Sequence, residues 1–138
     1  LQDNEAEDSY SMLPLFDQKK IEGSFREATV HHSINGNFSL RKNEWKLIMC
    51  PSSGGWSFPR PGVDNELLAT LPPIQLYNLD EDPAESKNLQ AMYPEKVEEL
   101  KSLLTKYITE GRSTPGAAQQ NDPSDNEWAQ LWWMEKEM

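Results

Sequence analysis

Apolar and polar residues alternate in three short stretches of the first half of the chain, as they do in strands with one buried face. Residues 28–34 are rich in β-branched side chains, residues 38–41 alternate, and residues 45–50 alternate before becoming fully apolar. Asn35-Gly36 is a strong signal for a two-residue hairpin turn, and Lys42-Asn43 supplies the next turn. The pattern predicts a three-stranded antiparallel meander.

A fourth strand and one long helix follow. Residues 74–79 alternate again, Pro94 stands where a helix tolerates proline best, and Gly111 is a fitting stop. Between these two residues, apolar side chains recur at spacings of three and four: Val97, Leu100, Leu103, Leu104, Tyr107 and Ile108. The sequence therefore predicts an α+β fold in which one long helix packs on a four-stranded antiparallel sheet.

The remaining segments suggest how the chain is organised. Residues 51–73 hold five of the ten prolines, and structureless loops longer than about 12–15 residues are often functional. The N-terminal segment is acidic and ends in an apolar cluster at residues 12–16 that needs a partner surface, while three tryptophans near the C-terminus are too much apolar surface to leave in water. We expect a strap at 1–22, a domain at 23–111, and a linker with a Trp-rich tail at 112–138.

Composition narrows the classes of function. The chain has 138 residues, a one-domain length, with net charge −10 and 36% hydrophobic residues, below the usual ~45–50%. We therefore expect part of it to be uncovered or disordered. Such an acidic balance argues against a nucleic-acid binder, and only residues 18–62, with more bases than acids, offer an anion a favourable field. No apolar run is long enough to span a membrane, and without an initiating Met the chain is expected to be a piece of a longer protein.

His31 and His32 are the only histidines. Adjacent residues of a regular strand point to opposite faces, so both rings cannot serve one metal. Two interpretations stay open. Either the two form a structural pair with one ring buried and one exposed, or one of them lies at a strand end and reaches an anionic substrate.

Two further patterns were candidates for chemistry: the single cysteine and a partial calcium-loop sequence. Cys50 is the single cysteine, which excludes an internal disulfide framework and predicts a free, buried thiol at a strand end. Residues 78–82 resemble the start of a calcium loop, but Pro83 stands where such a loop needs Gly and Leu89 where it needs Glu. We expect no calcium there.

The segment from Leu76 to Leu89, LYNLDEDPAESKNL, resembles a signature near the C-terminus of arylsulfatase-type bacterial sulfatases: LYDL, two residues, DP, one residue, E, two residues, NL. Further similar segments are residues 8–9, 12–14, 26–27, 30–33, 38–42, 45–48, 93–95 and 107–116. The resemblance covers roughly residues 1–116, and the tail from Ala117 lies outside it. It implies that the strap at 1–22 is the end of a missing catalytic domain.

The resemblance implies a parent enzyme with a large N-terminal alkaline-phosphatase-like α/β domain and a small C-terminal domain of the predicted kind. It also implies a formylglycine nucleophile, made from the Cys or Ser of a C-x-P-S-R motif, and calcium held by acidic and amide residues of the N-terminal domain. Cys50-Pro51-Ser52-Ser53-Gly54 is only a near match, with proline one position early and no Arg. We therefore expect no catalytic or metal-binding residue here, no cofactor bound by this chain, and no activity of the chain alone. Export to the periplasm or medium rests on the resemblance only.

Within the parent enzyme this chain is expected to pack on the catalytic domain and to line the cleft for a sulfated small molecule or carbohydrate. Glycines let a loop backbone approach a ligand, and Trp56 offers a flat face to an aryl group or sugar. Positively charged side chains attract a sulfate group. The cleft candidates are His31, His32, Ser33, Gly54, Gly55, Trp56, Arg41, Lys42 and Arg60.

The alternative is a noncatalytic module whose acidic surface and Trp-rich tail bind a protein partner. A C-x-P-S-R motif encoded a few hundred residues upstream of Leu1 distinguishes the two. The sequence itself gives neither the substrate nor the oligomeric state.

Overall fold

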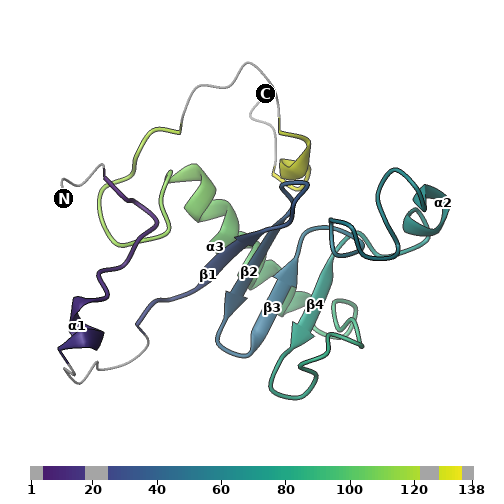
Figure 1. Cartoon of the computed structure of the whole chain (residues 1–138), viewed down its shortest axis with the longest axis horizontal. Coiled ribbons are helices and arrows are strands. Elements are labelled where there is room, and N and C mark those ends of the chain that lie inside the picture. Colours follow the sequence, from purple (N-terminus) through teal and green to yellow (C-terminus); the bar gives the residue numbers. More distant parts are fainter. Residues whose placement is uncertain (1–4, 18–24, 122–127, 135–138) are drawn as a thin grey trace.

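The structure is a computed structural model that describes residues 5–17, 25–121 and 128–134. Figure 1 shows a four-stranded sheet with α3 lying across its far side and the loop that carries α2 projecting from one edge. The predicted α+β fold is confirmed. In chain order the elements are α1 (Leu13–Phe16), β1 (Thr29–His32), β2 (Phe38–Lys42), β3 (Trp45–Ile48), α2 (Asn65–Leu68), β4 (Gln75–Asn78), α3 (Pro94–Thr109) and the short 3-10 helix η1 (Ala129–Leu131).

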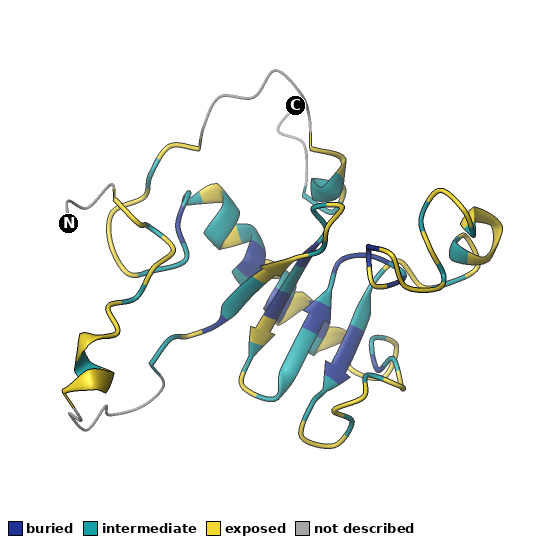
Figure 2. Cartoon of the chain, viewed as in Figure 1, coloured by how far each residue is buried: buried dark blue, intermediate teal, exposed yellow. Residues whose placement is uncertain are grey.

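The sheet is antiparallel throughout, with its strands in sequence order. Its register places Val30, Leu40, Leu47 and Leu76 side by side on one face, and the three leucines are fully buried. This is the face that α3 covers with Val97, Leu100 and Leu104, so the dark core of Figure 2 lies between sheet and helix. The predicted meander, the fourth strand and the packed helix are all present.

The first hairpin turn is one residue longer than predicted. Ser33 donates its N–H to the Asn37 carbonyl at 2.9 Å, and Gly36 donates to the Ser33 carbonyl at 2.9 Å, so the loop consists of Ile34, Asn35 and Gly36. Gly36 has a φ of +78°, the left-handed conformation that ends a three-residue hairpin loop. Ile34 therefore belongs to the turn, and β1 ends at His32, with Ser33 as the pair that closes the loop.

Two other local predictions need correction. Lys42 pairs with Trp45 and closes β2, so the second turn is Asn43-Glu44, with Asn43 in the left-handed region at φ +54°. The long loop at 51–73 is not wholly irregular, because the short helix α2 lies within it.

The end of α3 was predicted correctly at Gly111. Gly111 donates its N–H to the Ile108 carbonyl at 3.2 Å, and Arg112 donates to the Tyr107 carbonyl at 3.1 Å. With Gly111 at φ +62°, these are the two hydrogen bonds of a Schellman motif. Glycine is required here for two reasons. The backbone is left-handed, and a Cβ would lie 2.5 Å from the Gln119 carbonyl oxygen.

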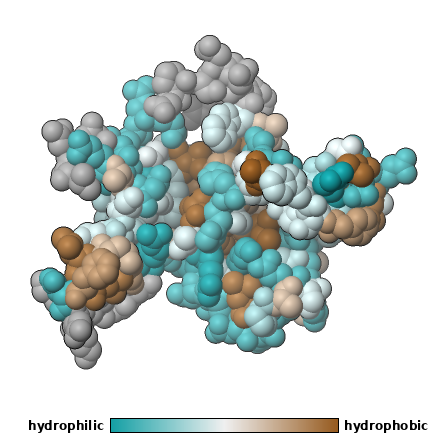
Figure 3. All heavy atoms as spheres, viewed as in Figure 1, coloured by the Kyte–Doolittle hydropathy of each residue, from teal (hydrophilic) through white to brown (hydrophobic). Residues whose placement is uncertain are grey.

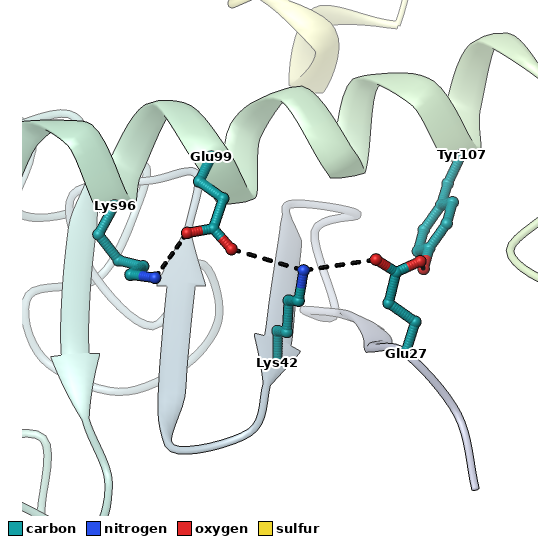
Figure 4. Close-up of polar contacts among 5 residues, drawn as sticks. All are labelled: Glu27, Lys42, Lys96, Glu99 and Tyr107. Carbon is teal, nitrogen blue, oxygen red and sulfur yellow. Dashed lines mark hydrogen bonds and ion pairs between the residues drawn. The ribbon is translucent and has the colours of Figure 1, made fainter. Parts of the chain in front are cut away.

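A chain of charged side chains joins α3 to the sheet (Figure 4). Lys42 lies 3.4 Å from a carboxylate oxygen of both Glu27 and Glu99, and Glu99 is also paired with Lys96 at 2.5 Å. Tyr107 donates its hydroxyl to Glu27 at 3.2 Å, and burial followed by the charge of Glu27 raises the pKa of Tyr107. The network therefore fixes α3 to β2 and to the segment before β1.

Replacing Glu99 with glutamine is expected to lower the free energy of unfolding by about 0.3–1 kcal/mol at pH 7, which is the contribution of a typical exposed ion pair. The hydrogen bond from Lys96, followed by the charges of Lys96 and Lys42, holds the pKa of Glu99 below its usual value. Its contribution is therefore present above the pKa of the unfolded chain and is lost as pH falls through the lower pKa of the folded state. Urea unfolding of both proteins between pH 7 and 3 checks this, and a difference that stays constant down to pH 3 contradicts it.

The two terminal segments pack against the domain in different ways. In the N-terminal strap, the Asp8 carboxylate accepts the N–H and hydroxyl of Ser113, whereas the apolar side chains around α1 stay exposed. In the tail, Trp133 packs edge-on against Phe38 with ring centroids 5.6 Å apart. The tail thus covers part of its apolar surface, as predicted, while Trp128 and Trp132 remain about half exposed. Residues 18–24 and 122–127 of the predicted strap and linker, and 135–138 of the tail, lie outside the described residues.

Candidate substrate-binding surface

The first hairpin turn and the loop after β3 meet without an intervening side chain. The Ser33 hydroxyl accepts hydrogen bonds from the N–H of Asn37 at 3.1 Å and from its Nδ2 at 3.4 Å. Gly54 lies directly against this pair at φ +64°, and a Cβ there would lie 2.7 Å from the Ser33 oxygen and 2.8 Å from Asn37 Nδ2. Only glycine fits between these atoms in this backbone conformation.

The contact continues to Ile34, which is 66% exposed. A Cβ on Gly55 would lie 3.2 Å from the side chain of Ile34, at the tip of the turn. Trp56 follows at once and is 80% exposed. We name Ser33, Ile34, Asn37, Gly54, Gly55 and Trp56 the turn–loop surface. It brings together four of the nine predicted cleft residues, Ser33, Gly54, Gly55 and Trp56. Gly54 and Gly55 are buried against the turn, so the prediction that their backbone approaches a ligand is wrong, and of the four only Ser33 and Trp56 are accessible to solvent.

Polar contacts to β4 hold the start of this loop. Gln75 donates its Nε2 to the Cys50 carbonyl at 2.6 Å and to the Ser52 carbonyl at 2.9 Å. The buried Ser52 hydroxyl accepts the N–H of Gly54 at 3.3 Å. Asn37, Ser52 and Gln75 were missed by sequence reasoning. Asn37 adjoins a turn signal, but nothing near Gln75 in the sequence indicates that it serves a loop 25 residues away.

His31 and Arg41 lie on the sheet face opposite α3. On this face Thr29, Arg41, Lys46 and Tyr77 form one row and His31, Ser39, Ile48 and Gln75 the next. Partial burial of the ring, followed by the positive charges of Lys46, Arg41 and His32, lowers the pKa of His31. The ring of His31 is therefore neutral at pH 7, so it can donate or accept a hydrogen bond but does not add charge.

The remaining candidates lie elsewhere. His32 is on the α3 side of the sheet, with its ring 4.2 Å from Phe38, which confirms that the two histidines point to opposite faces. Both are exposed, so the predicted pair with one ring buried is wrong. Lys42 is engaged in the ion pairs of Figure 4, and Arg60 lies in the projecting loop, where its N–H binds the Asp64 carboxylate at 2.7 Å.

Figure 3 shows brown, apolar groups over α1 and over the projecting loop, with a mixture of polar and apolar surface between them. The exposed large apolar residues of these two places are Met12, Leu13, Leu15 and Phe16 around α1, and Phe58, Val63 and Leu67 in the loop. Neither group is part of the turn–loop surface.

No three His, Cys, Asp or Glu residues of the described part lie close enough together to hold a metal ion. Cys50 is free and buried, as predicted, and burial raises the pKa of its thiol, which disfavours the nucleophilic thiolate. Of the helices that the structure describes, none is long and apolar enough to cross a membrane.

No protein-family model matches the chain, and no curated protein matches it. Among solved structures, it is similar to a 6S-sulfatase from work on the metabolism of multiple glycosaminoglycans by Bacteroides thetaiotaomicron. The TM-score is 0.59 and the identity 28%, over 79% of this chain and 22% of that chain, so this chain spans about a fifth of the neighbour's length. The likeness supports a sulfatase-type C-terminal region without singling out the arylsulfatase type. Over most of its length, this chain is thus similar to part of a sulfatase.

Proposed function

We propose that this chain is the C-terminal region of a sulfatase and that the longer protein hydrolyses sulfate esters of a carbohydrate. The observation that carries the proposal is the likeness to the 6S-sulfatase chain, at 28% identity over 79% of this chain. A sulfated saccharide is preferred as substrate because that neighbour was studied in glycosaminoglycan metabolism. The arylsulfatase subtype and export from the cell rest on the motif resemblance alone.

The motif at Leu76–Leu89 serves the fold. Asn88 accepts the N–H of Leu76 through its Oδ1 and donates its Nδ2 to the Ile74 carbonyl, so it closes the outer edge of β4. Asp82 accepts the N–H groups of Ser86 and Lys87, and these hydrogen bonds, that of Lys87 foremost, lower its pKa. The motif thus shapes the return from β4 to α3.

The described part of this chain offers neither the C-x-P-S-R cysteine nor a calcium ligand set, so the nucleophile and calcium that the resemblance implies do not fit here. We assign the turn–loop surface to one wall of the substrate cleft of the longer protein. Its backbone is close-packed and fixed by Ser52 and Gln75, and Trp56 presents its exposed ring beside it. His31 and Arg41, on the open sheet face, are the other polar candidates.

In the longer protein, replacing Trp56 with alanine is expected to lower kcat/KM for a sulfated saccharide about tenfold, mainly through KM. The loss corresponds to about 1.4 kcal/mol, near the upper end of what a single aromatic contact adds. Phe58→Ala is the matched control, because Phe58 is 76% exposed in the same loop but lies outside the turn–loop surface. Equal kinetics of the two variants contradict the assignment of Trp56.

The noncatalytic alternative is tested at the level of the gene. We expect a C-x-P-S-R motif a few hundred residues upstream of Leu1. If the upstream sequence lacks it, the sulfatase proposal fails and the acidic interaction module takes its place.

A further inference from the structure

Residues 128–134 of the tail bind the two segments from which the turn–loop surface is built. Gln130 donates its Nε2 to the Asn35 carbonyl, at the tip of the first hairpin turn, at 2.8 Å. Trp132 donates its Nε1 to the carbonyl of Met49, the first residue after β3, at 3.3 Å. Figure 1 shows η1 beside the tip of the turn between β1 and β2. The tail therefore lies next to the turn–loop surface.

Other side chains of the tail attach it to the core. Leu131 packs against the buried cluster between α3 and the sheet. Trp133 packs edge-on against Phe38 and donates its Nε1 to the Thr105 hydroxyl at 3.3 Å. These contacts are separate from those to the turn and to Met49, so this part of the tail is fixed on two sides.

The ring of Trp132 is held in place but remains 51% exposed. Its N–H is bound by Met49, and the ring of Trp133 stands nearly perpendicular to it, at 86° with centroids 6.1 Å apart. An aromatic ring whose orientation is already fixed offers a flat apolar face and loses little conformational entropy when a ligand binds. Such a face suits the apolar side of a sugar ring.

The two exposed rings reach the turn through different residues. Trp56 belongs to the loop that packs against Ile34, whereas Trp132 belongs to the tail that binds Asn35. The two rings therefore suit two sugar units and not a single one.

We propose that Trp132 forms a second saccharide subsite beside the turn–loop surface, where it stacks on a sugar unit other than the one at Trp56. The inference rests on the proposed function and deepens it, because a second subsite makes the substrate a saccharide chain and not a single sulfated sugar. The motif resemblance does not predict this subsite, since the tail from Ala117 lies outside the resemblance.

Substrates of two lengths test the proposal in the longer protein. Replacing Trp132 with alanine is expected to lower kcat/KM about tenfold for a sulfated tetrasaccharide and to leave that for the corresponding sulfated monosaccharide nearly unchanged. Trp128→Ala is the matched control, because Trp128 is a half-exposed tryptophan of the same tail but lines a groove beside α3. We expect this control to change neither value.

Two results overturn the inference. An equal loss on both substrates would show that Trp132 acts only by bracing the turn, and an unchanged value for the tetrasaccharide would show that its ring binds no sugar. Both results leave the proposed function standing, because the unsubstituted longer protein still releases sulfate.

Binding to this chain alone gives a readout that needs no sulfatase activity. When the same tetrasaccharide is titrated into the chain, the indole N–H signals of Trp56 and Trp132 are expected to shift with one common dissociation constant. The signal of Trp133, whose N–H is bound to Thr105, serves as the internal reference and is expected to stay. A Trp132 signal that stays with it contradicts the subsite, even if the longer protein releases no sulfate.

Discussion

Replacing Leu100 with alanine is expected to lower the free energy of unfolding of this chain by about 2–5 kcal/mol. Leu100 is fully buried at the centre of α3, where it packs in the same cluster as Leu40, Leu47 and Leu76. The substitution removes apolar atoms from this layer and leaves a cavity that the neighbouring strands fill only in part. Because domains are usually stable by only about 5–15 kcal/mol, this is a large fraction of the total.

Leu67→Ala is the matched control, because Leu67 is also a helical leucine but is 41% exposed on α2. Its expected cost is below about 1 kcal/mol. Urea unfolding followed by circular dichroism gives both values. If the two variants lose equal stability, the single core between α3 and the sheet is not what holds the domain together.

Replacing Gly54 with alanine is expected to lower the free energy of unfolding by about 2–4 kcal/mol and to displace the first hairpin turn. One part of the cost is the left-handed backbone, at φ +64°, which disfavours any residue with a Cβ. The other part is the contact of that Cβ with the Ser33 hydroxyl and the Asn37 amide at under 3 Å, which neither group can relieve while their mutual hydrogen bond is kept. In the longer protein the same change is expected to lower kcat/KM by at least tenfold.

Gly62→Ala separates the two parts. Gly62 has a similar φ of +81°, but a Cβ there would meet no atom within 4 Å. We therefore expect about 1 kcal/mol of backbone strain and no change at the turn. Amide chemical shifts of Ser33 and Asn37 report the displacement. Shifts that move equally in the two variants would show that Gly54 is not close-packed against the turn.

The fold could be read from the sequence because its strong signals are local. Pro94, Gly111 and the apolar spacing between them define α3 without reference to the rest of the chain. The first turn could not be read in this way, since Asn-Gly suits both a two-residue loop and the end of a three-residue loop. A two-residue loop would pair Leu40 with His31 and place that ring toward α3. The observed loop pairs Leu40 with Val30, so burial of an apolar side chain selects the register.

The candidate surface was predictable in part. The glycines and Trp56 stood out because a Gly-rich loop before an aromatic residue is locally visible. The contact between Gly54 and Ser33 was not visible, because it joins segments 21 residues apart through a turn whose length was unknown. Lys42 was assigned to the second turn but lies in β2. With Lys42 in the strand, it and Arg41 are expected on opposite faces of the sheet, because neighbours on a strand face opposite sides.

Release of sulfate from a sulfated saccharide tests the central proposal most directly. The protein extended by the region encoded upstream of Leu1 is expected to release sulfate. This chain alone, whose single thiol is buried at Cys50, is expected to release none. An extended protein that folds but releases no sulfate from any sulfated saccharide or aryl sulfate contradicts the account, and so does turnover by this chain alone.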